Sequence, residues 1–333
     1  MDGRDARLRR VLKSRGVRLW ASDPEHDRLR LRALRASPPG LARARGERRQ
    51  VFAASLGQFD ELLTAAAAVG PASAPLPLYY ALNQAGRAVA AAQQRDPLRW
   101  QPKRHGLSVG NPPPTLGGTV ISPWKPGKGK SADDSFSVMA DTIGSPRLTD
   151  AITLGALWAA APGTERVKRL GVSEPPALQL EPVGAGYPSI SGRLPGPITS
   201  GQAALRNQLE RSYPLARSGM ELSIGLLAGE RIAQVSWRTP TGVIRALDDV
   251  TSRFPGSEGA CYLMPGLGAN DDVLAPLMVW WALLYALSHV ARYQPAAWTR
   301  ALDPLNSTLA VPIESALAWA REVMPGLVLE VLT

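Results

Sequence analysis

A run of 19 residues without a formal charge, 273–291, constrains this chain more than any other stretch. Its sequence, VLAPLMVWWALLYALSHVA, is close to the length that an α-helix needs to cross a bilayer. The run contains Pro276 and His289, continues into Arg292, and has no counterpart elsewhere in the chain. A helix that is apolar all round is also what the centre of a large helical domain requires. We therefore expect a buried core helix and no membrane-spanning segment.

The rest of the composition fits a folded protein with one or two domains. A chain of 333 residues, 45% hydrophobic and 20% charged, can bury a sizeable core. Its single cysteine, Cys261, excludes an intramolecular disulfide and a cysteine-based metal site. The acidic residues show no paired spacing typical of a metal centre, so we expect no metal. The opening residues, MDGRDARLRR, lack the apolar stretch of a signal peptide, and we expect a cytoplasmic protein.

The net charge of +10 is concentrated near the start of the chain. Residues 1–50 hold 15 of the 38 Lys and Arg and 6 of the 28 Asp and Glu, so this segment alone carries +9. A basic arm of this kind can contact phosphates through counterion release. It is more typical of a solvated helical segment in an arginine-rich chain. Basicity is therefore a property of this segment and not of the whole fold.

Helical patterns occur on both sides of a long middle region. Apolar residues at steps of three and four predict an amphipathic helix over 50–69. The Pro-rich break GPASAPLP follows, and a second helix is expected over 78–94, antiparallel to the first because the connection is short. From residue 271 the chain is helical again. The two helical ends are expected to share one core, since neither alone has enough helices to bury its apolar faces.

The middle region differs from the two helical ends in composition and residue pattern. Residues 106–130 are rich in Pro and Gly, whereas 177–183, 219–226 and 231–237 have the pattern of short strands separated by turn residues. The sequence therefore predicts a mainly α (α+β) fold. Its expected parts are a basic helical segment (1–50), a helical bundle built from 51–105 and 271–333, and a loop-rich α/β insertion (106–270).

The second predicted helix carries an ordered polar face. Tyr80, Asn83, Gln84 and Arg87 lie at positions that share one face of a helix, with Tyr79 at its edge. An ordinary solvated face would carry Glu and Lys, which are absent here. Three interpretations stay open: plain surface, a hydrogen-bonded seam against another part of the protein, or a ligand-binding surface.

His105 follows this helix in a basic stretch that includes Arg99 and Arg104. A histidine beside a fixed arginine is the minimal set for metal-free RNA cleavage. The imidazole can take the proton of the 2′-hydroxyl near neutral pH, and the guanidinium can stabilise charge that develops on the phosphate. The Arg99-x5-His105 spacing fits this chemistry, and Arg87 is a second candidate for the phosphate partner. A loop histidine in a basic turn is the alternative interpretation.

Two further stretches carry residues of chemical interest. Arg292 emerges from the otherwise uncharged helix beside His289, either as a second place where polar groups converge or as a cation favoured by the helix dipole. GKGKS, residues 127–131, resembles part of a phosphate-binding loop. The required spacing places a glycine at position 124, where Trp124 stands. We therefore expect no such loop and no cofactor.

Several segments of this sequence resemble segments of the YaaC-like family of bacterial proteins. They are PLPLYYALNQAGRAVAAA, the HGL at 105–107, LLYALSHVARYQPAAW, and the Ile313-Glu314 pair. The resemblance covers the chain from about residue 48 to the C-terminus. The 79–107 block is also similar to HEPN domains, helical bundles whose active members are metal-independent ribonucleases, often dimeric and often used in toxins or antiviral defence.

The resemblance implies an RNA- or nucleotide-binding HEPN-like protein, with ribonuclease activity as the finer expectation. It implies catalytic roles for His105 as the base and for Arg87 or Arg99 as the phosphate partner. RNA or a nucleotide is the expected ligand, and a homodimer or a protein partner is a further expectation. The alternative is a non-catalytic interaction or scaffold protein, in which the polar helix face is a structural seam. The residues expected on the substrate side are Tyr79, Tyr80, Asn83, Gln84, Arg104 and Arg292.

Overall fold

The computed structural model describes residues 23–110, 115–125, 127, 133–170, 174–183, 190–194, 199–214, 217, 220–227, 230–237, 252–253 and 261–333. The first part of the predicted basic segment, residues 1–22, and most of GKGKS lie outside the described residues. The described part holds nine α-helices and nine strands, so the protein is mainly α with some β structure, as predicted.

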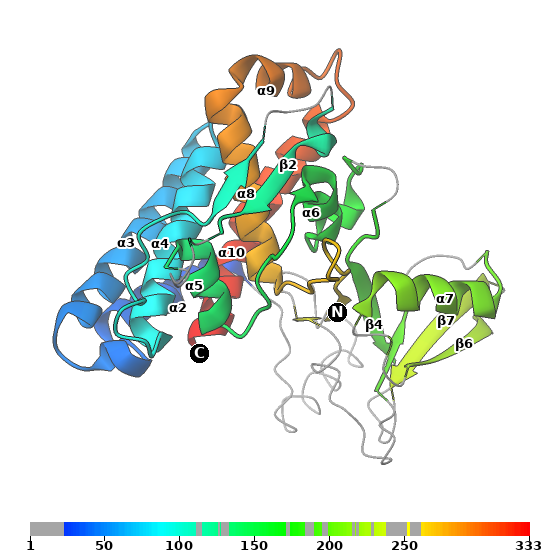
Figure 1. Ribbon diagram of the computed structural model, residues 1–333, viewed down its shortest axis with the longest axis horizontal. Coiled ribbons are helices and arrows are strands. Elements are labelled where there is room, and N and C mark those ends of the chain that lie inside the picture. The colour runs from blue at the N-terminus through cyan, green and yellow to red at the C-terminus, as the bar shows by residue number, and fades with distance from the viewer. Residues whose placement is uncertain are drawn as a thin grey trace, which may run out of the picture.

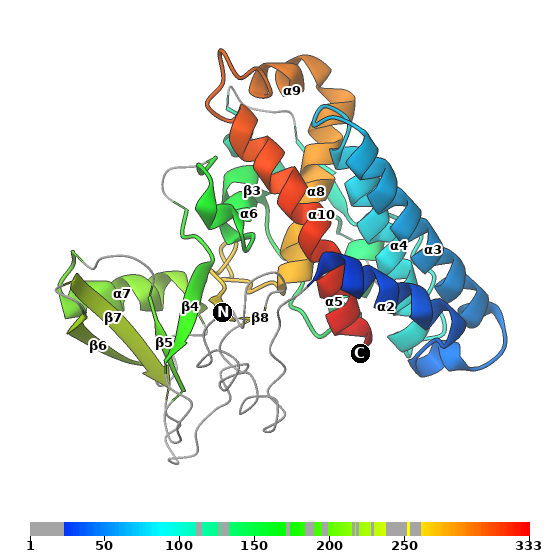
Figure 2. The same ribbon diagram turned by 180° about the vertical axis from the view of Figure 1, so that it is seen from behind.

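Helices from the two ends of the chain lie side by side (Figures 1 and 2). Tyr79 and Leu82 from one end belong to the same hydrophobic core as Trp281, Leu284 and Val328 from the other, which confirms the predicted sharing. The short helix α2 crosses α3 and α10. The helices are α2 (Pro24–Ala36), α3 (Glu47–Ala68), α4 (Pro75–Gln93), α8 (Pro276–Tyr293), α9 (Pro295–Ala301) and α10 (Ala310–Leu332), with a 3-10 turn η1 (Gly40–Arg43).

Helix α8 is the central element, as the uncharged run predicts. All of its residues from Pro276 to Ser288 are buried. Where it crosses α4, the Trp281 ring fills the space that Gly86 leaves: a Cβ atom at position 86 would lie 2.4 Å from Cη2 of the indole. The absence of a side chain at this point therefore fixes how closely α4 and α8 approach. No described helix is long and apolar enough to cross a bilayer.

A small antiparallel sheet packs against this bundle. Its strands β1 (Leu107–Val109), β2 (Val120–Pro123) and β3 (Ile152–Thr153) lie in the order β1-β2-β3. Leu107 pairs with Pro123, and Ile121 pairs with Ile152. Leu107, Ile121, Phe136 and Trp158 all join the larger core, although they come from the predicted insertion. The accompanying helices are α5 (Ser135–Thr142) and α6 (Leu154–Ala160), with the 3-10 turns η2 (Leu116–Gly118) and η3 (Thr164–Arg166).

A second sheet with its own core lies to one side of the bundle (Figure 1). Its strand order is β6-β7-β5-β4-β9-β8, and all pairings are antiparallel. Trp237 and Leu209 are buried between the sheet and its helix. The three strands predicted from the sequence are confirmed as β4, β6 and β7. The elements are β4 (Leu178–Val183), β5 (Ile190–Arg193), α7 (Gln202–Ser212), β6 (Met220–Leu227), β7 (Glu230–Trp237), β8 (Ser252–Arg253) and β9 (Cys261–Leu263).

Arg48 of α3 fixes the end of α4, the helix that carries the polar face. Its guanidinium donates hydrogen bonds to the carbonyl oxygens of Ala91 (3.1 Å) and Gln94 (3.0 Å). These carbonyls have no partner within the helix, and a cation at a helix C-terminus also interacts favourably with the helix dipole. The same guanidinium lies 4.7 Å from the ring centre of Trp100. The chain that leaves α4 towards His105 is therefore anchored.

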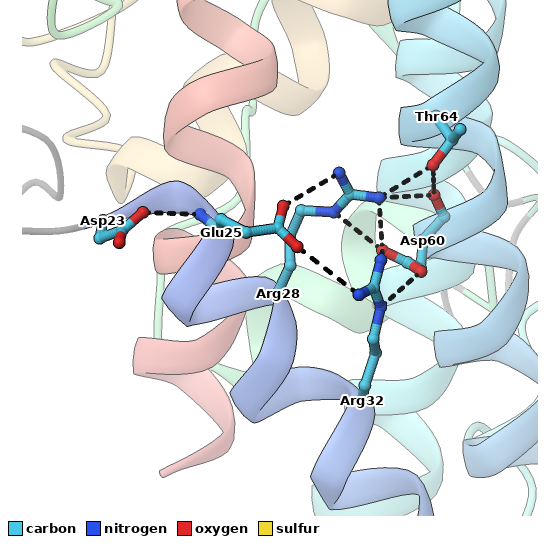
Figure 3. Close-up of polar contacts among 6 residues, drawn as sticks. All are labelled: Asp23, Glu25, Arg28, Arg32, Asp60 and Thr64. Carbon is cyan, nitrogen blue, oxygen red and sulfur yellow. Dashed lines mark hydrogen bonds and ion pairs between the residues drawn. The ribbon is translucent and has the colours of Figure 1, made fainter.

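Two arginines hold α2 against α3 (Figure 3). Arg28 and Arg32 each donate a hydrogen bond from Nε to the Asp60 carboxylate, both at 2.9 Å. Arg28 also reaches the Thr64 hydroxyl at 2.9 Å. Burial of Asp60 opposes its ionisation, but the hydrogen bonds and charges of the two arginines outweigh this and lower the pKa of the carboxyl. The contact is therefore strongest when Asp60 is ionised.

We expect Asp60→Asn to lower the free energy of unfolding by about 1 kcal/mol at neutral pH, since the pair is only partly shielded from solvent. A lowered folded-state pKa contributes stability above the unfolded-state pKa of about 4. This contribution is lost as the pH falls through the folded value. Urea unfolding of wild type and variant, at neutral and at acid pH, checks this, with the exposed neighbour Glu61→Gln as the control. If the free energies of unfolding of wild type and Asp60→Asn differ as much at acid pH as at neutral pH, the stabilising contact does not depend on ionised Asp60, and the prediction is wrong.

Candidate functional site

The polar face of α4 meets His105 at a buried tyrosine. Tyr79 is fully buried, and its hydroxyl lies 2.7 Å from Nδ1 of His105. Burial is the main cause that raises the pKa of Tyr79, and the nearby Tyr285 and Tyr80 act in the same direction, against Asn83 and Arg292. The phenol is therefore neutral throughout the physiological range. It holds one nitrogen of the imidazole in place.

The backbone around His105 is fixed by the start of α5. Gly106 adopts a φ of +89°, and a Cβ atom there would lie 1.8 Å from Oδ1 of Asp134. That carboxylate caps α5 by accepting a hydrogen bond from the Ser137 amide at 2.8 Å. The carbonyl oxygen of His105 accepts from the Phe136 amide at 3.3 Å. Glycine at 106 lets the chain pass the cap and turn into β1, which sets the position of the imidazole.

Helix α8 supplies the opposite side of the site. The Tyr285 hydroxyl donates to the carbonyl oxygen of Leu107 at 2.6 Å, and its ring lies 5.2 Å from the Tyr79 ring, centre to centre. Arg292, two turns further along, donates from Nη1 to the Tyr80 hydroxyl at 3.1 Å. These contacts join α4, α8 and the loop before β1. We call this set of residues the polar cluster: Tyr79, Tyr80, Asn83, Arg87, His105, Tyr285, His289, Arg292 and Tyr293.

The polar cluster carries positive charge without a matching carboxylate. Among the described residues, neither Arg87 nor Arg292 forms an ion pair with an acidic side chain. Partial burial, together with the charges of Arg292 and Arg87, lowers the pKa of His105. Burial and Arg292 likewise lower the pKa of His289. Both imidazoles are therefore neutral near pH 7, and the arginines supply the positive charge.

The interior of the polar cluster is closed and its rim is open. Tyr79, Asn83 and Tyr285 are buried, whereas Arg87 and His105 are exposed. Two polar atoms at this boundary, Nδ1 of His289 and Nε of Arg292, are shielded from solvent and lack a hydrogen-bond partner among the described residues. The interior thus has the features of a hydrogen-bonded seam, and the rim presents an arginine and a histidine to solvent.

A family model described as YaaC-like Protein matches residues 27–332, nearly the whole chain. The chain belongs to the YaaC-like protein family. No curated protein and no solved structure matches it. The matched segment of this YaaC-like chain contains every residue of the polar cluster. In the described part of the chain, no group of three or more His, Cys, Asp or Glu side chains could hold a metal ion.

The YaaC-like chain brings most of the residues predicted for the site into one place. Tyr79, Tyr80, Asn83, Arg87, His105 and Arg292 all lie in the polar cluster, joined by the hydrogen bonds, ring contacts and charge effects given above. Gln84 lies half-buried on the same helix, and its side chain makes no hydrogen bond with the described residues.

Two predicted site residues have other partners in the YaaC-like chain. Arg99 forms an ion pair with Asp141 at 2.6 Å, a carboxylate that Arg147 also binds. Arg104 stacks over Trp124, 4.7 Å from the ring centre, and lies 3.7 Å from a carboxylate oxygen of Asp133. The charges that lower the pKa of His105 are those of Arg292 and Arg87, so Arg87 is the better candidate for the arginine that acts with this histidine.

Three aromatic residues of the polar cluster were not among the residues predicted for the site. Tyr285, His289 and Tyr293 follow one another at steps of four along α8, with ring centres 6.4 Å and 4.6 Å apart. Residues four apart lie on one face of a helix, so this spacing is the signal by which the sequence could have revealed them. It is hidden because the surrounding residues are almost all apolar.

Proposed function

We propose that this YaaC-like protein binds RNA or a nucleotide at its polar cluster, with the phosphate on Arg87 and Arg292. The observation that carries the proposal is the pair of arginines without a carboxylate partner among the described residues, beside neutral histidines. Guanidinium groups match the geometry of phosphate oxygens, and a charged group without a counter-ion is a ready anion site. This function agrees with the HEPN-like resemblance of the 79–107 block.

We further propose that the bound RNA is cleaved without a metal ion. His105 takes the proton of a 2′-hydroxyl, and the 2′-oxygen attacks the adjacent phosphorus. The bond from phosphorus to the 5′-oxygen breaks, and that oxygen takes a proton from solvent, which gives a 2′,3′-cyclic phosphate and a 5′-hydroxyl. Arg87 and Arg292 stabilise the charge that develops on the phosphate oxygens.

The hydrogen bond to Tyr79 defines how His105 would act as the base. If Nε2 accepts the proton, Nδ1 must carry the ring proton and donate it to the Tyr79 oxygen. Tyr79 then acts as a positioning residue that selects this tautomer. The lowered pKa of His105 keeps the imidazole unprotonated, and ready to accept a proton, at neutral pH.

The closed interior of the polar cluster favours a second candidate function, a non-catalytic interaction or scaffold protein. The Tyr79–His105, Tyr80–Arg292 and Tyr285–Leu107 hydrogen bonds would then serve to lock α4, α8 and β1 together. The two functions differ at the rim, because Arg87 and His105 contact RNA or a nucleotide in the first and do not in the second. A homodimer, a protein partner and a cytoplasmic location stay predictions.

Binding of a labelled single-stranded RNA, followed by fluorescence anisotropy, separates the two candidates. We expect wild type to bind, and Arg87→Gln to weaken binding about tenfold, because an exposed guanidinium that contacts phosphate is lost. Arg95→Gln, a change at another exposed arginine just beyond α4, is the matched control and should have little effect. Absence of binding by wild type, or an equal loss in both variants, would favour the scaffold.

A further inference from the structure

The C-terminal end of α8 presents an aromatic side chain to solvent beside the polar cluster. Tyr293 is 63% exposed, and its ring centre lies 4.6 Å from that of His289. The guanidinium of Arg292 lies 4.8 Å from the centre of the same ring. One exposed tyrosine thus has a histidine and an arginine as close neighbours.

Among the described residues, Tyr293 is the only aromatic residue in the set of large, exposed apolar side chains. Leu98 and Leu305 are more exposed, at 85% and 91%, but an aliphatic side chain has no ring face on which a base or a cation could lie. Scattered exposed apolar residues are normal and need no explanation. A tyrosine beside a histidine ring, with an arginine that forms no ion pair among the described residues, is a different arrangement because it combines a flat surface with positive charge.

A series of ring contacts connects this tyrosine to the candidate base. The His105 and Tyr285 ring centres are 6.0 Å apart, those of Tyr285 and His289 are 6.4 Å apart, and Tyr293 follows. The exposed tyrosine and the histidine therefore belong to one series of packed rings. Arg292 lies along it and contacts both Tyr80 and Tyr293.

We infer that Tyr293 is a stacking platform for an unpaired nucleobase, so that the ligand is single-stranded RNA and not duplex RNA. The inference rests on the proposed function, because it places the phosphate of the same nucleotide strand on Arg87 and Arg292. Single-stranded nucleic acids bind where aromatic faces for their bases alternate with cations for their backbone. In a duplex the bases are stacked and paired, and a protruding tyrosine has no base face to meet.

Binding of three ligands tests the platform. The ligands are a short single-stranded RNA, a strand of equal length that has the ribose-phosphate backbone without bases, and a fully paired RNA duplex. Wild type is expected to bind the single strand more tightly than either of the others. Tyr293→Ala should weaken binding of the single strand about tenfold and leave binding of the abasic strand unchanged. Tyr293→Phe keeps the ring and should bind as wild type does.

Leu305→Ala, a change at another exposed apolar residue, is the control, and circular dichroism verifies that each variant is folded. If wild type binds the single strand and Tyr293→Ala binds it equally well, Tyr293 does not stack on a base, and the proposed phosphate site at Arg87 and Arg292 is unaffected. An equal loss for the single and abasic strands would also overturn the platform, since it would show that Tyr293 only positions Arg292. Failure of wild type to bind any RNA would remove the proposed function itself.

Discussion

Replacement of His105 by alanine is expected to reduce RNA cleavage by about 10²–10⁴-fold and to leave RNA binding largely intact. In the proposed mechanism the imidazole accepts the 2′-hydroxyl proton, whereas Arg87 and Arg292 hold the phosphate. His26→Ala is the matched control, because His26 is exposed on α2 and lies outside the polar cluster. Product formation is followed by electrophoresis of a labelled RNA, with the cyclic phosphate end identified by mass spectrometry.

The pH profile of cleavage distinguishes a catalytic base from a structural histidine. Burial and the charges of Arg292 and Arg87 lower the pKa of His105, so this imidazole stays unprotonated to a lower pH than a free histidine does. We expect kcat/KM to be constant around neutral pH and to fall only as the pH drops through this lowered pKa. In Arg87→Gln one of these charges is lost, the pKa of His105 rises, and the acid limb moves to higher pH. A limb that does not move would exclude His105 as the titrating base.

Tyr79→Phe tests whether the Tyr79 hydroxyl selects the tautomer of His105 that acts as the base. The variant keeps the buried ring but removes the hydroxyl that lies 2.7 Å from Nδ1. We expect kcat to fall and KM to change little, because the imidazole loses the partner that orients it while the phosphate contacts remain. Cleavage that survives in His105→Ala at the wild-type rate would overturn the whole assignment.

Gly86→Leu is expected to destabilise the protein by about 3 kcal/mol, because even a Cβ atom at this position lies 2.4 Å from the Trp281 ring. The Trp281 indole is 1% exposed and cannot move aside without displacing α8. Trp281→Ala, which leaves a cavity at the same crossing, should cost about 3–5 kcal/mol. Urea unfolding followed by circular dichroism measures both losses.

The double variant identifies the cause of these losses. If Gly86→Leu acts by overpacking against the indole, the cavity left by Trp281→Ala accommodates part of the new side chain. The combined loss in the free energy of unfolding is then smaller than the sum of the two single losses. Gly70→Leu is the control, since a Cβ atom at position 70 meets nothing within 4 Å. Full additivity would show that α4 and α8 are not held at their distance by this contact.

Periodicity alone could predict the helices that build the core. The step of three and four over Phe52, Leu56 and Phe59 predicts α3, and the uncharged run predicts α8. The structure extends the first to Glu47–Ala68 and starts the second predicted helix earlier, at Pro75, because proline is well tolerated in the first turn. Helix α5 was not predicted. Its eight residues follow a Pro- and Gly-rich stretch and are too few for a clear pattern.

The site was only partly predictable, because its members come from two ends of the chain. The polar face of α4 and the presence of His105 could be inferred from local spacing. The choice between Arg87 and Arg99 could not, since it depends on Asp141, which lies 42 positions beyond Arg99 and forms an ion pair with it. The part played by α8 was equally hidden: Tyr285 reaches the carbonyl of Leu107 across 178 positions.

This separation along the chain has a consequence for synthesis. A ribosome translates α4 and His105 long before it reaches α8, so during that interval the nascent chain exposes the small-residue face of α4, and Tyr79 lacks its ring contact with Tyr285. The arginine and aromatic residues from α8 arrive only after the long intervening region has been made, at synthesis rates of about 5–20 residues per second. Any activity that depends on both α4 and α8 is thus withheld until α8 has been synthesised, and a product terminated before α8 would lack it altogether.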